Sequence, residues 1–459
     1  MPRAKRIFLH FLCFVLCLSA CISPVDAVED STAPPSLIEA SAVSLYHVES
    51  QTAVLEKNAD TAFPAGSSVK VMAGLLFCEA FADRLYEAVE ITDEMVAQSA
   101  GYRLYLRAGD VLTVEQLLYA ALCASYNDAY DVLAVQASGS RAAFVAEMNA
   151  RAASLGCDNS VFTDPSGIDD SSQTDASDLL LIARTALENE LYMQLSSTLR
   201  YSFGGSQLLS AKTFYNRNAL LSKATTAEYF NAKCRGMSAG YTENGGSCVI
   251  TAAVYDEQTY LCIVMGARES DGTNYGYVVA NRMIKWGFDA FEYVEILTPE
   301  TVVCTIPVAV SDMMTEVEAR VGEPLICFLP KGTDPGELKY SIRLLQNELE
   351  APFSEGTMVG YVSVLYQGKT LGMLPLYTAV GAERSAFVGT LRAIQGLLRN
   401  RAFVSGAIFF CVVLCAWIVT ETVLQRRRRL KWDKYFSMKM DPAPNSLQGT
   451  GKGKRPPQN

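Results

Sequence analysis

Ala-Gly-Ser-Ser-Val-Lys at residues 65–70 stands directly before an apolar segment that predicts a helix from about Ser68 to Phe81. In a helix that begins near Ser67, this serine and Lys70 are three residues apart and share a face. The positive end of the helix dipole then lies near the serine oxygen, and burial lowers the pKa of a lysine from about 10.4. A neutral Lys70 is able to take the proton of Ser67. The competing interpretation is that Ser67 only caps the helix, since this spacing is common by chance.

Histidine is scarce in this chain. There are two, His10 and His47, and His10 lies in an apolar N-terminal segment. A Ser-His-Asp triad would therefore have to use His47. A zinc site built from several histidines is excluded by the count, and no CxxC pair offers a substitute. We expect no metal and no cofactor, and the net charge of −10 argues against nucleic acid as a partner.

Two further motifs follow the lysine. CASYND at 123–128 separates two helical segments, so a loop there is able to present the Ser125 hydroxyl and the Asn127 amide to a cleft. An ordinary turn with Asn127 or Asp128 as helix N-cap also fits. GMSAGYT at 236–242 comes just before two predicted strands, and its small residues would let a substrate backbone lie against a strand edge. A glycine-rich start of a strand is the plainer interpretation.

Taken in order, the three motifs resemble those of penicillin-binding proteins and serine β-lactamases. The similarity is closer to the D-alanyl-D-alanine carboxypeptidases among the low-molecular-mass penicillin-binding proteins. It extends over VLEKNADTAFPAGSSVK at 54–70, LRAGDVLTVEQLLYAALCASYNDA at 106–129, VFTDPSGIDDSSQTDASDLLLIARTAL at 161–187 and EAPFSEGTMVGYVSVLYQGKTLGMLPL at 350–376. Together these segments cover about Ser41 to Val380.

The resemblance implies a reaction and its residues. Ser67 would attack the carbonyl between two D-alanines of a peptidoglycan stem peptide, and β-lactams would acylate it by the same path. Lys70 would be the base and Ser125 the proton relay. The resemblance also implies substrate-binding positions, which in this sequence are Asn127, Ser238, Gly240 and Tyr241.

The third motif departs from the family's Lys-Thr-Gly. Ser238 stands at the lysine position and Ala239 at the threonine position, and only Gly240 is kept. Losing one charge-assisted hydrogen bond costs about 1.5–3 kcal/mol, which weakens an enzyme without abolishing its chemistry. In a regular strand Lys233 and Arg235 point away from Ser238, so they replace the lost charge only if the strand bulges.

Three functions therefore stay open. The first is a serine D-Ala-D-Ala carboxypeptidase with reduced or altered activity. The second is a catalytically impaired wall-peptide-binding or β-lactam-sensing protein on the same fold. The third is a β-lactamase, for which the helical middle of the chain offers no convincing glutamate to activate the deacylating water.

The order of the expected elements indicates an α/β (α+β) fold. Strands near Ser41–Leu55 and at 248–267 enclose a mostly helical middle, which predicts an antiparallel sheet flanked by helices with an all-helical subdomain. A small β-rich domain and one transmembrane helix follow. We expect a signal peptide at 1–27, a DD-peptidase-like catalytic domain at 36–292, a β domain at 293–380, a juxtamembrane amphipathic segment at 385–400, a transmembrane helix at 402–424 and a basic cytoplasmic tail at 425–459.

The two ends determine the expected location. A basic start followed by a short apolar stretch indicates secretion, with cleavage after Ala27; a lipoprotein signal ending at Cys21 or a retained anchor are the alternatives. Four arginines at 426–429 should hold the tail in the cytoplasm and leave the body outside a cell membrane. Eight cysteines lie in that body, an even number that permits disulfides without showing them.

Overall fold

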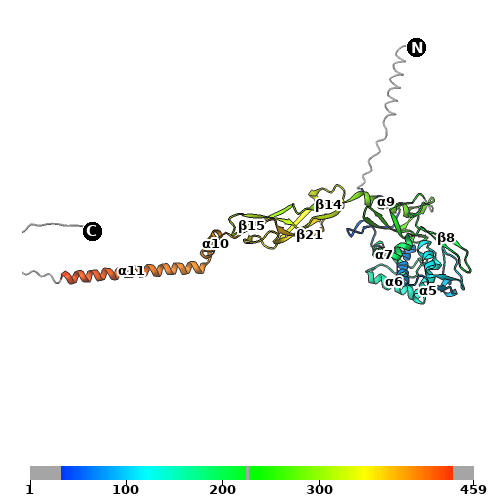
Figure 1. The fold of residues 1–459 in the computed structure, drawn as a ribbon, viewed down its shortest axis with the longest axis horizontal. Coiled ribbons are helices and arrows are strands. Elements are labelled where there is room, and N and C mark those ends of the chain that lie inside the picture. The colour runs from blue at the N-terminus through cyan, green and yellow to red at the C-terminus, as the bar shows by residue number, and fades with distance from the viewer. Residues whose placement is uncertain (1–32, 224–226, 438–459) are drawn as a thin grey trace, which may run out of the picture. The chain divides into compact units, whose positions relative to one another are not determined.

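The computed structural model describes residues 33–223 and 227–437 and divides into two compact units (Figure 1). The first unit contains the chain up to Ile296 together with Ile326–Glu337, and the second contains Leu297–Leu325 and the chain from Leu338 onward. The expected signal peptide, whichever way it is processed, lies outside the described residues.

The first unit is built on a five-stranded antiparallel sheet in the order β2-β1-β11-β10-β9. The strands span Ala42–His47 (β1), Thr52–Lys57 (β2), Cys234–Thr242 (β9), Gly246–Tyr255 (β10) and Gln258–Ala267 (β11). β1 pairs with β11, so the beginning and the end of this unit meet in the middle of one sheet. The prediction of a sheet assembled from both chain ends is confirmed, and β9 is left as the edge strand of the sheet as described.

Helices fill the middle of the chain and cover the sheet. They are α2 (Val69–Phe81), α3 (Asp93–Val96), α4 (Val114–Leu118), a π-helical turn (Tyr119–Cys123), α5 (Asn127–Ser138), α6 (Arg141–Leu155), α7 (Ala176–Glu188), α8 (Glu190–Ser197) and α9 (Tyr275–Ala290). Three of their ends were predictable from local chemistry. Thr113 and Gln116 form the expected capping box, and Ser140 caps α6, which stops at Gly156 in a left-handed conformation.

Helix α2 lies at the centre of the helical half. Its buried residues include Val69, Leu75, Phe77 and Phe81, with apolar neighbours on every side. A mostly apolar helix belongs in a core, so α2 fixes the position of the short turn Gly66–Ser68 before it, which contacts β9 and β10. Four short strand pairs link the outer loops of the unit: β3–β6 (Phe63–Pro64, Gln173–Thr174), β4–β5 (Ala88–Glu90, Val111–Thr113), β7–β8 (Arg200–Phe203, Lys212–Tyr215) and β12–β13 (Glu269–Ser270, Thr273–Asn274).

The eight cysteines of the expected body are free thiols in the described structure. Seven of them are buried and Cys304 is half-buried. Burial raises the pKa of thiols such as Cys123 and Cys234 to about 12, so they stay protonated and pack as small apolar side chains.

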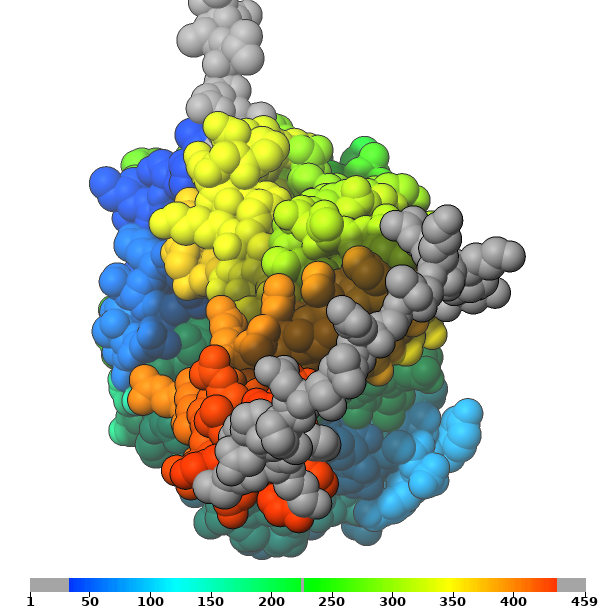
Figure 2. Space-filling model, turned by 90° about the vertical axis from the view of Figure 1, so that its left-hand side faces the viewer, coloured from blue at the N-terminus to red at the C-terminus, as the bar shows by residue number. Residues whose placement is uncertain are grey.

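The second unit is β-rich, as expected. Its six-stranded sheet has the order β18-β20-β21-β16-β15-β19. The strands are β15 (Val302–Ala309), β16 (Glu316–Val321), β18 (Lys339–Leu344), β19 (Leu349–Glu350), β20 (Met358–Tyr366) and β21 (Lys369–Thr378). They form part of the yellow-green to yellow surface in Figure 2. A separate two-stranded pair of β14 (Phe291–Leu297) and β17 (Leu325–Pro330) lies almost wholly in the first unit.

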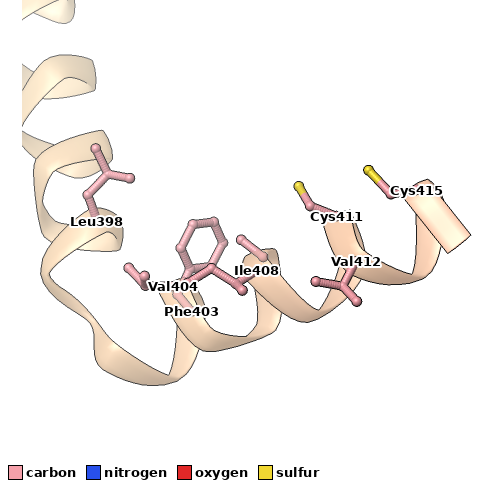
Figure 3. A pocket seen from close by; sticks show the side chains of 8 residues that line it. Leu398, Phe403, Val404, Ile408, Cys411, Val412 and Cys415 are labelled. Carbon is pink, nitrogen blue, oxygen red and sulfur yellow. The ribbon is translucent and has the colours of Figure 1, made fainter.

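Two helices end the described chain. α10 (Ala386–Arg399) has its apolar side chains exposed, among them Phe387, Leu391 and Ile394. α11 (Arg401–Ser437) contains a segment long and apolar enough to cross a membrane, with a mean hydropathy of 2.6 and none of it buried. An apolar groove of about 460 Å³ is lined by Leu398 of α10 and by side chains of α11 that include Ile408 and Cys411. Figure 3 shows these side chains. Its lining suits hydrocarbon and offers no acid, base or charged group.

Candidate active site

A cleft of about 300 Å³ in the first unit brings the three sequence motifs together. Its walls come from the start of α2, the turn before α5, strand β9 and three further loops. The lining residues are Ser67, Lys70, Gly101, Tyr102, Ser125, Asn127, Ser166, Ile168, Asp170, Arg217, Ala239, Gly240, Tyr241, Thr242 and Glu243. Six of the seven predicted site residues are in this set, and Ser238 is not.

Lys70 is buried and fully hydrogen-bonded at the floor of the cleft. Its Nζ donates to the Ser125 carbonyl at 3.0 Å, to the Ser125 Oγ at 2.8 Å and to the Asn127 Oδ1 at 2.7 Å. Burial, with a smaller effect from the nearby Arg217 guanidinium, lowers the pKa of Lys70 to about 7. A large share of the molecules thus holds a neutral amine at neutral pH, the form that can accept a proton.

Ser67 lies in the short 3₁₀ turn Gly66–Ser68 that leads into α2. Its Oγ is buried and has no hydrogen-bond partner among the described residues. A buried hydroxyl without a partner is costly, and an active site is where such a cost is tolerated. Gly240 of β9 lies directly against it, because a Cβ built on this glycine would be 2.8 Å from the Ser67 Cβ. The one retained residue of the third motif is therefore the one that leaves room beside the serine.

Ser125 is held in a left-handed conformation, with φ at 60°. It follows the π-helical turn, and its backbone N–H donates to the Ala121 carbonyl at 2.8 Å. Such a conformation is strained for a residue with a Cβ, and strain of this kind gathers at functional sites. Asn127 is tied down as well, since its Nδ2 donates to the Ala100 carbonyl at 2.8 Å. Both groups that contact Lys70 are thus placed rigidly.

The loop that follows α6 forms another wall of the cleft. The Asp164 carboxylate accepts hydrogen bonds from the Ser166 hydroxyl and the Ile168 N–H, both at 2.9 Å. Gly167 sits between them at φ +76°, and any side chain on it would run into the Gly66 carbonyl. The loop therefore packs directly against the turn that carries Ser67.

Lys233 and Arg235 were expected to replace the lost charge only if the strand bulged. β9 does bulge, because the register with β10 shifts between Ile250 and Ala252. Even so, the Lys233 Nζ lies 4.1 Å from the centre of the Tyr255 ring, and the Arg235 guanidinium donates to backbone carbonyls of its own segment. Ser238 is half-buried outside the cleft lining, so the structure gives no support for its direct contact with a substrate.

Arg217 is a cationic side chain in the cleft lining that sequence reasoning missed. It lines the cleft with its guanidinium stacked 4.6 Å from the centre of the Tyr102 ring. The buried side chains of Asn216 and Asn218 hold the backbone on either side, the latter donating to the Gly236 carbonyl at 2.9 Å. An arginine between two buried asparagines is a local signal, yet only the fold shows that this segment is tied to β9 through Asn218.

His47 takes no part in this cleft. It is buried at the end of β1, where its ring stacks on Phe328 with centroids 3.9 Å apart. Its Nδ1 lies 2.8 Å from the Ser50 Oγ. The described lining of the cleft therefore contains serine and lysine side chains and no histidine.

A serine and a lysine that share one cleft, between an edge strand and a helical half, are the layout of a serine enzyme that works without histidine. A sequence model of the family described as D-alanyl-D-alanine carboxypeptidase matches residues 28–269, more than half of the chain. The chain belongs to this family. Residues 291–384 match a second model, described as penicillin-binding protein 5, C-terminal domain.

Known proteins are similar to this chain in sequence, and solved structures are similar to it in fold. The chain is 24% identical over 364 residues to D-alanyl-D-alanine carboxypeptidase DacF of Bacillus subtilis, covering 78% of this chain and 90% of that protein. It is 27% identical to DacC of Escherichia coli, covering 79% and 89%. The fold is similar to that of penicillin-binding protein 5 from Haemophilus influenzae, with a TM-score of 0.55, 23% identity and coverage of 77% and 99%. DacD from Francisella tularensis gives a TM-score of 0.58 at 21% identity, covering 77% and 96%.

Proposed function

We propose that this member of the carboxypeptidase family removes the terminal D-alanine from peptidoglycan stem peptides by way of an acyl-enzyme on Ser67. The observation that carries the proposal is the Lys70 amine, buried with a pKa of about 7 and in contact with Ser125 in the cleft that Ser67 lines. A neutral amine in that position can act as a base without histidine.

The proposed steps use the residues that line the cleft. The Ser67 oxygen attacks the carbonyl between the two D-alanines, and its proton passes to Lys70, directly or through the Ser125 hydroxyl. The tetrahedral oxyanion is held by backbone N–H groups at Ser67 and near Tyr241. The C–N bond then breaks, Ser125 relays the proton to the leaving amine, and D-alanine departs. Water hydrolyses the Ser67 ester, and a β-lactam acylates Ser67 in the same way.

Arg217 takes the role that a lysine has in the family's third motif. The substrate ends in a carboxylate, and the Arg217 guanidinium is a charged donor that lines the cleft. Planar donors of this kind bind carboxylates well. In this proposal the Ser238-Ala239 change alters substrate selection and leaves the reaction in place.

The test uses the full chain beside a Ser67→Ala variant. Fluorescent penicillin should label the unmodified chain and not the variant, and a D-Ala-D-Ala peptide should lose one D-alanine. Labelling without D-alanine release would favour the second candidate, a β-lactam-sensing or wall-peptide-binding protein, which the altered Ser238-Ala239 pair supports. Rapid turnover of the drug would favour a β-lactamase.

We also infer the placement of the chain in the membrane. The arginines at 426–429 follow the apolar part of α11 and favour a cytoplasmic C-terminal tail, with the catalytic domain (36–292) and the β domain (293–380) outside the cell membrane. The exposed apolar side chains of α10 suit a segment lying along the membrane surface.

A further inference from the structure

Arg141 occupies an unfavourable place for a cation. It is the first residue of α6, where the positive end of the helix dipole opposes a guanidinium. Its side chain lies between two buried carboxylates: the Nε is 3.1 Å from the Asp131 Oδ1 on α5, and the Nη2 is 3.5 Å from the Asp164 Oδ2 in the loop after α6. A buried acid without a cation is costly, so these two acids explain the arginine and the helix does not.

Asp164 connects the arginine to one wall of the cleft. Its carboxylate accepts hydrogen bonds from the Ser166 hydroxyl and the Ile168 N–H, and both of these residues line the cleft. The same loop packs against the turn that carries Ser67. A shift of Asp164 would therefore move this wall and disturb the turn beside it.

Asp131 connects the arginine to a second wall. The Ser99 hydroxyl donates to the Asp131 Oδ2 at 2.6 Å, and the Nη1 of Arg141 donates to the Gln98 Oε1. Two neighbouring residues of one loop are thus bound to the ion pair between α5 and α6. The loop before α5 and the loop after α6 share a single guanidinium as their anchor.

The loop at 98–102 is in direct contact with the groups around Lys70. The Ala100 carbonyl accepts from the Asn127 Nδ2, and the Tyr102 carbonyl accepts from the Asn127 N–H, each at 2.8 Å. Asn127 contacts the Lys70 amine through its Oδ1, and Tyr102 lines the cleft. A change in this loop would therefore displace the amide that holds the base.

The two acids also act on Lys70 through their charge. Burial, followed by the Arg217 guanidinium, lowers the pKa of Lys70, and the carboxylates of Asp164 and Asp131 oppose both effects. Burial raises the pKa of Asp131 to about 6, and the Arg141 guanidinium opposes this rise. The other groups that act on the pKa of Asp131 are Ser99, Asp164 and Asp128. Arg141 thus helps to keep Asp131 ionised at neutral pH.

We propose that Arg141 is a positioning residue for the acylation of Ser67, which anchors two walls of the cleft and keeps the Asp131 charge near Lys70. This inference rests on the proposed function in so far as that function includes acylation of Ser67, and it adds a residue from outside the cleft. Arg141 is not among the described lining residues, so it acts through Asp131 and Asp164 and not on the substrate.

The experiment measures the rate of penicillin labelling of the full chain in a non-ionic detergent between pH 5 and 9. Arg141→Gln should lower the rate on the plateau above pH 7 about tenfold, because both walls lose their common anchor. Arg151→Gln is the matched control, since Arg151 lies on the same helix and pairs with Glu79 at 2.7 Å, and neither residue is in the described cleft lining. Its labelling rate should equal that of the unmodified chain.

Asp131→Asn separates charge from position. The amide oxygen still accepts the Ser99 hydrogen bond but carries no charge, so the Lys70 pKa should fall. We expect the midpoint of the pH profile to move to lower pH by about half a unit, with the plateau rate within about threefold of the unmodified chain. A purely structural role for the cluster would leave the midpoint unchanged.

Hydrogen exchange gives a measurement that needs no reaction. Amides at 98–102 and 164–168 should exchange faster in Arg141→Gln than in Arg151→Gln, whether or not Ser67 reacts with penicillin. An unmodified chain without labelling would count against the proposed function, while faster exchange of both loops would still support the anchor. Equal exchange and equal labelling in the two arginine variants would overturn the inference. If Arg141→Gln does not fold, a midpoint that stays in place in Asp131→Asn overturns it, and a move to lower pH supports it.

Discussion

The Lys70 Nζ lies 2.8 Å from the Ser125 Oγ, and this contact joins two residues 55 positions apart in the chain. With the Asn127 Oδ1 at 2.7 Å, it places the amine in a buried site that lowers the lysine pKa to about 7. Every proton transfer proposed for the cleft passes through this group, so its titration is the first property to examine.

Acylation of Ser67 should depend on pH through Lys70. Below pH 7 the amine is protonated and cannot act as a base, so the rate should rise about tenfold per pH unit and level off above about pH 7. The measurement is the rate of labelling by penicillin between pH 5 and 9. A flat profile would contradict a lysine base.

The same pKa shift affects stability in a known direction. Between about pH 7 and 10.5 the unfolded chain keeps a proton that folded Lys70 has lost. Because the unfolded state binds more protons in this window, the contribution of this group makes the free energy of unfolding rise with pH. Denaturant titrations at pH 7.5 and 9.5 measure the free energy of unfolding of the unmodified chain and of Lys70→Met. The rise with pH in the unmodified chain should exceed that in Lys70→Met by the contribution of Lys70.

Ser125 combines a hydroxyl with a strained backbone, and two variants separate them. Ser125→Ala and Ser125→Gly both remove the hydroxyl, so both should slow acylation about 100-fold. Only glycine accepts a φ of 60° without strain, so Ser125→Gly should be more stable than Ser125→Ala by about 0.5–1 kcal/mol. Thermal unfolding measures the stability difference between the two variants, and the kinetics of penicillin labelling measure their acylation rates. If the alanine variant kept near-normal kinetics, the relay role would be wrong.

Arg217 should recognise the terminal carboxylate. Arg217→Gln is expected to lower kcat/KM for a D-Ala-D-Ala peptide about 10- to 100-fold, the range for one charge-assisted hydrogen bond. A peptide with an amidated end lacks that carboxylate, so the variant should discriminate less between the acid and the amide than the unmodified chain does. Arg217→Gln also removes a charge that lowers the Lys70 pKa, so its pH profile should move to higher pH.

Gly240 should tolerate no side chain. In Gly240→Ala the new Cβ would meet the Ser67 Cβ at 2.8 Å and the Oγ at 2.9 Å, which displaces the nucleophile. We expect acylation to fall at least tenfold with little change in melting temperature. Gly204→Ala is the matched control, because a Cβ there meets nothing within 4 Å. Equal kinetics in the two variants would show that β9 does not confine Ser67.

The parts of this fold that depend on neighbouring residues were predictable from the sequence. The Thr113–Gln116 capping box and the start and end of α6 follow from side chains within a few positions of each other. Ser67 and Lys70 line the same cleft for a similarly local reason, since they are three residues apart at the start of one helix. Arg217 and the bulge in β9 were not predictable, because each depends on segments that only the finished fold brings together. Contacts between residues near in sequence can be predicted, and contacts between distant segments cannot. Arg217, the site residue that sequence reasoning missed, is placed by contacts of the second kind.

Restoring the third motif tests whether Arg217 and position 238 bind the same substrate carboxylate. Ser238→Lys with Ala239→Thr adds the cation and the hydroxyl that the family usually has on β9, so turnover of a D-Ala-D-Ala peptide should rise. Because Arg217 already supplies a charge, the gain should be modest in the unmodified chain and larger in the Arg217→Gln background, where the substrate carboxylate has lost its partner. Two substitutions that serve one carboxylate are not additive, so a double-mutant cycle of kcat/KM values measures their coupling. Equal gains in both backgrounds would mean that Arg217 and the third motif act on different groups, and an unchanged or lower rate in both would show that position 238 does not face the substrate.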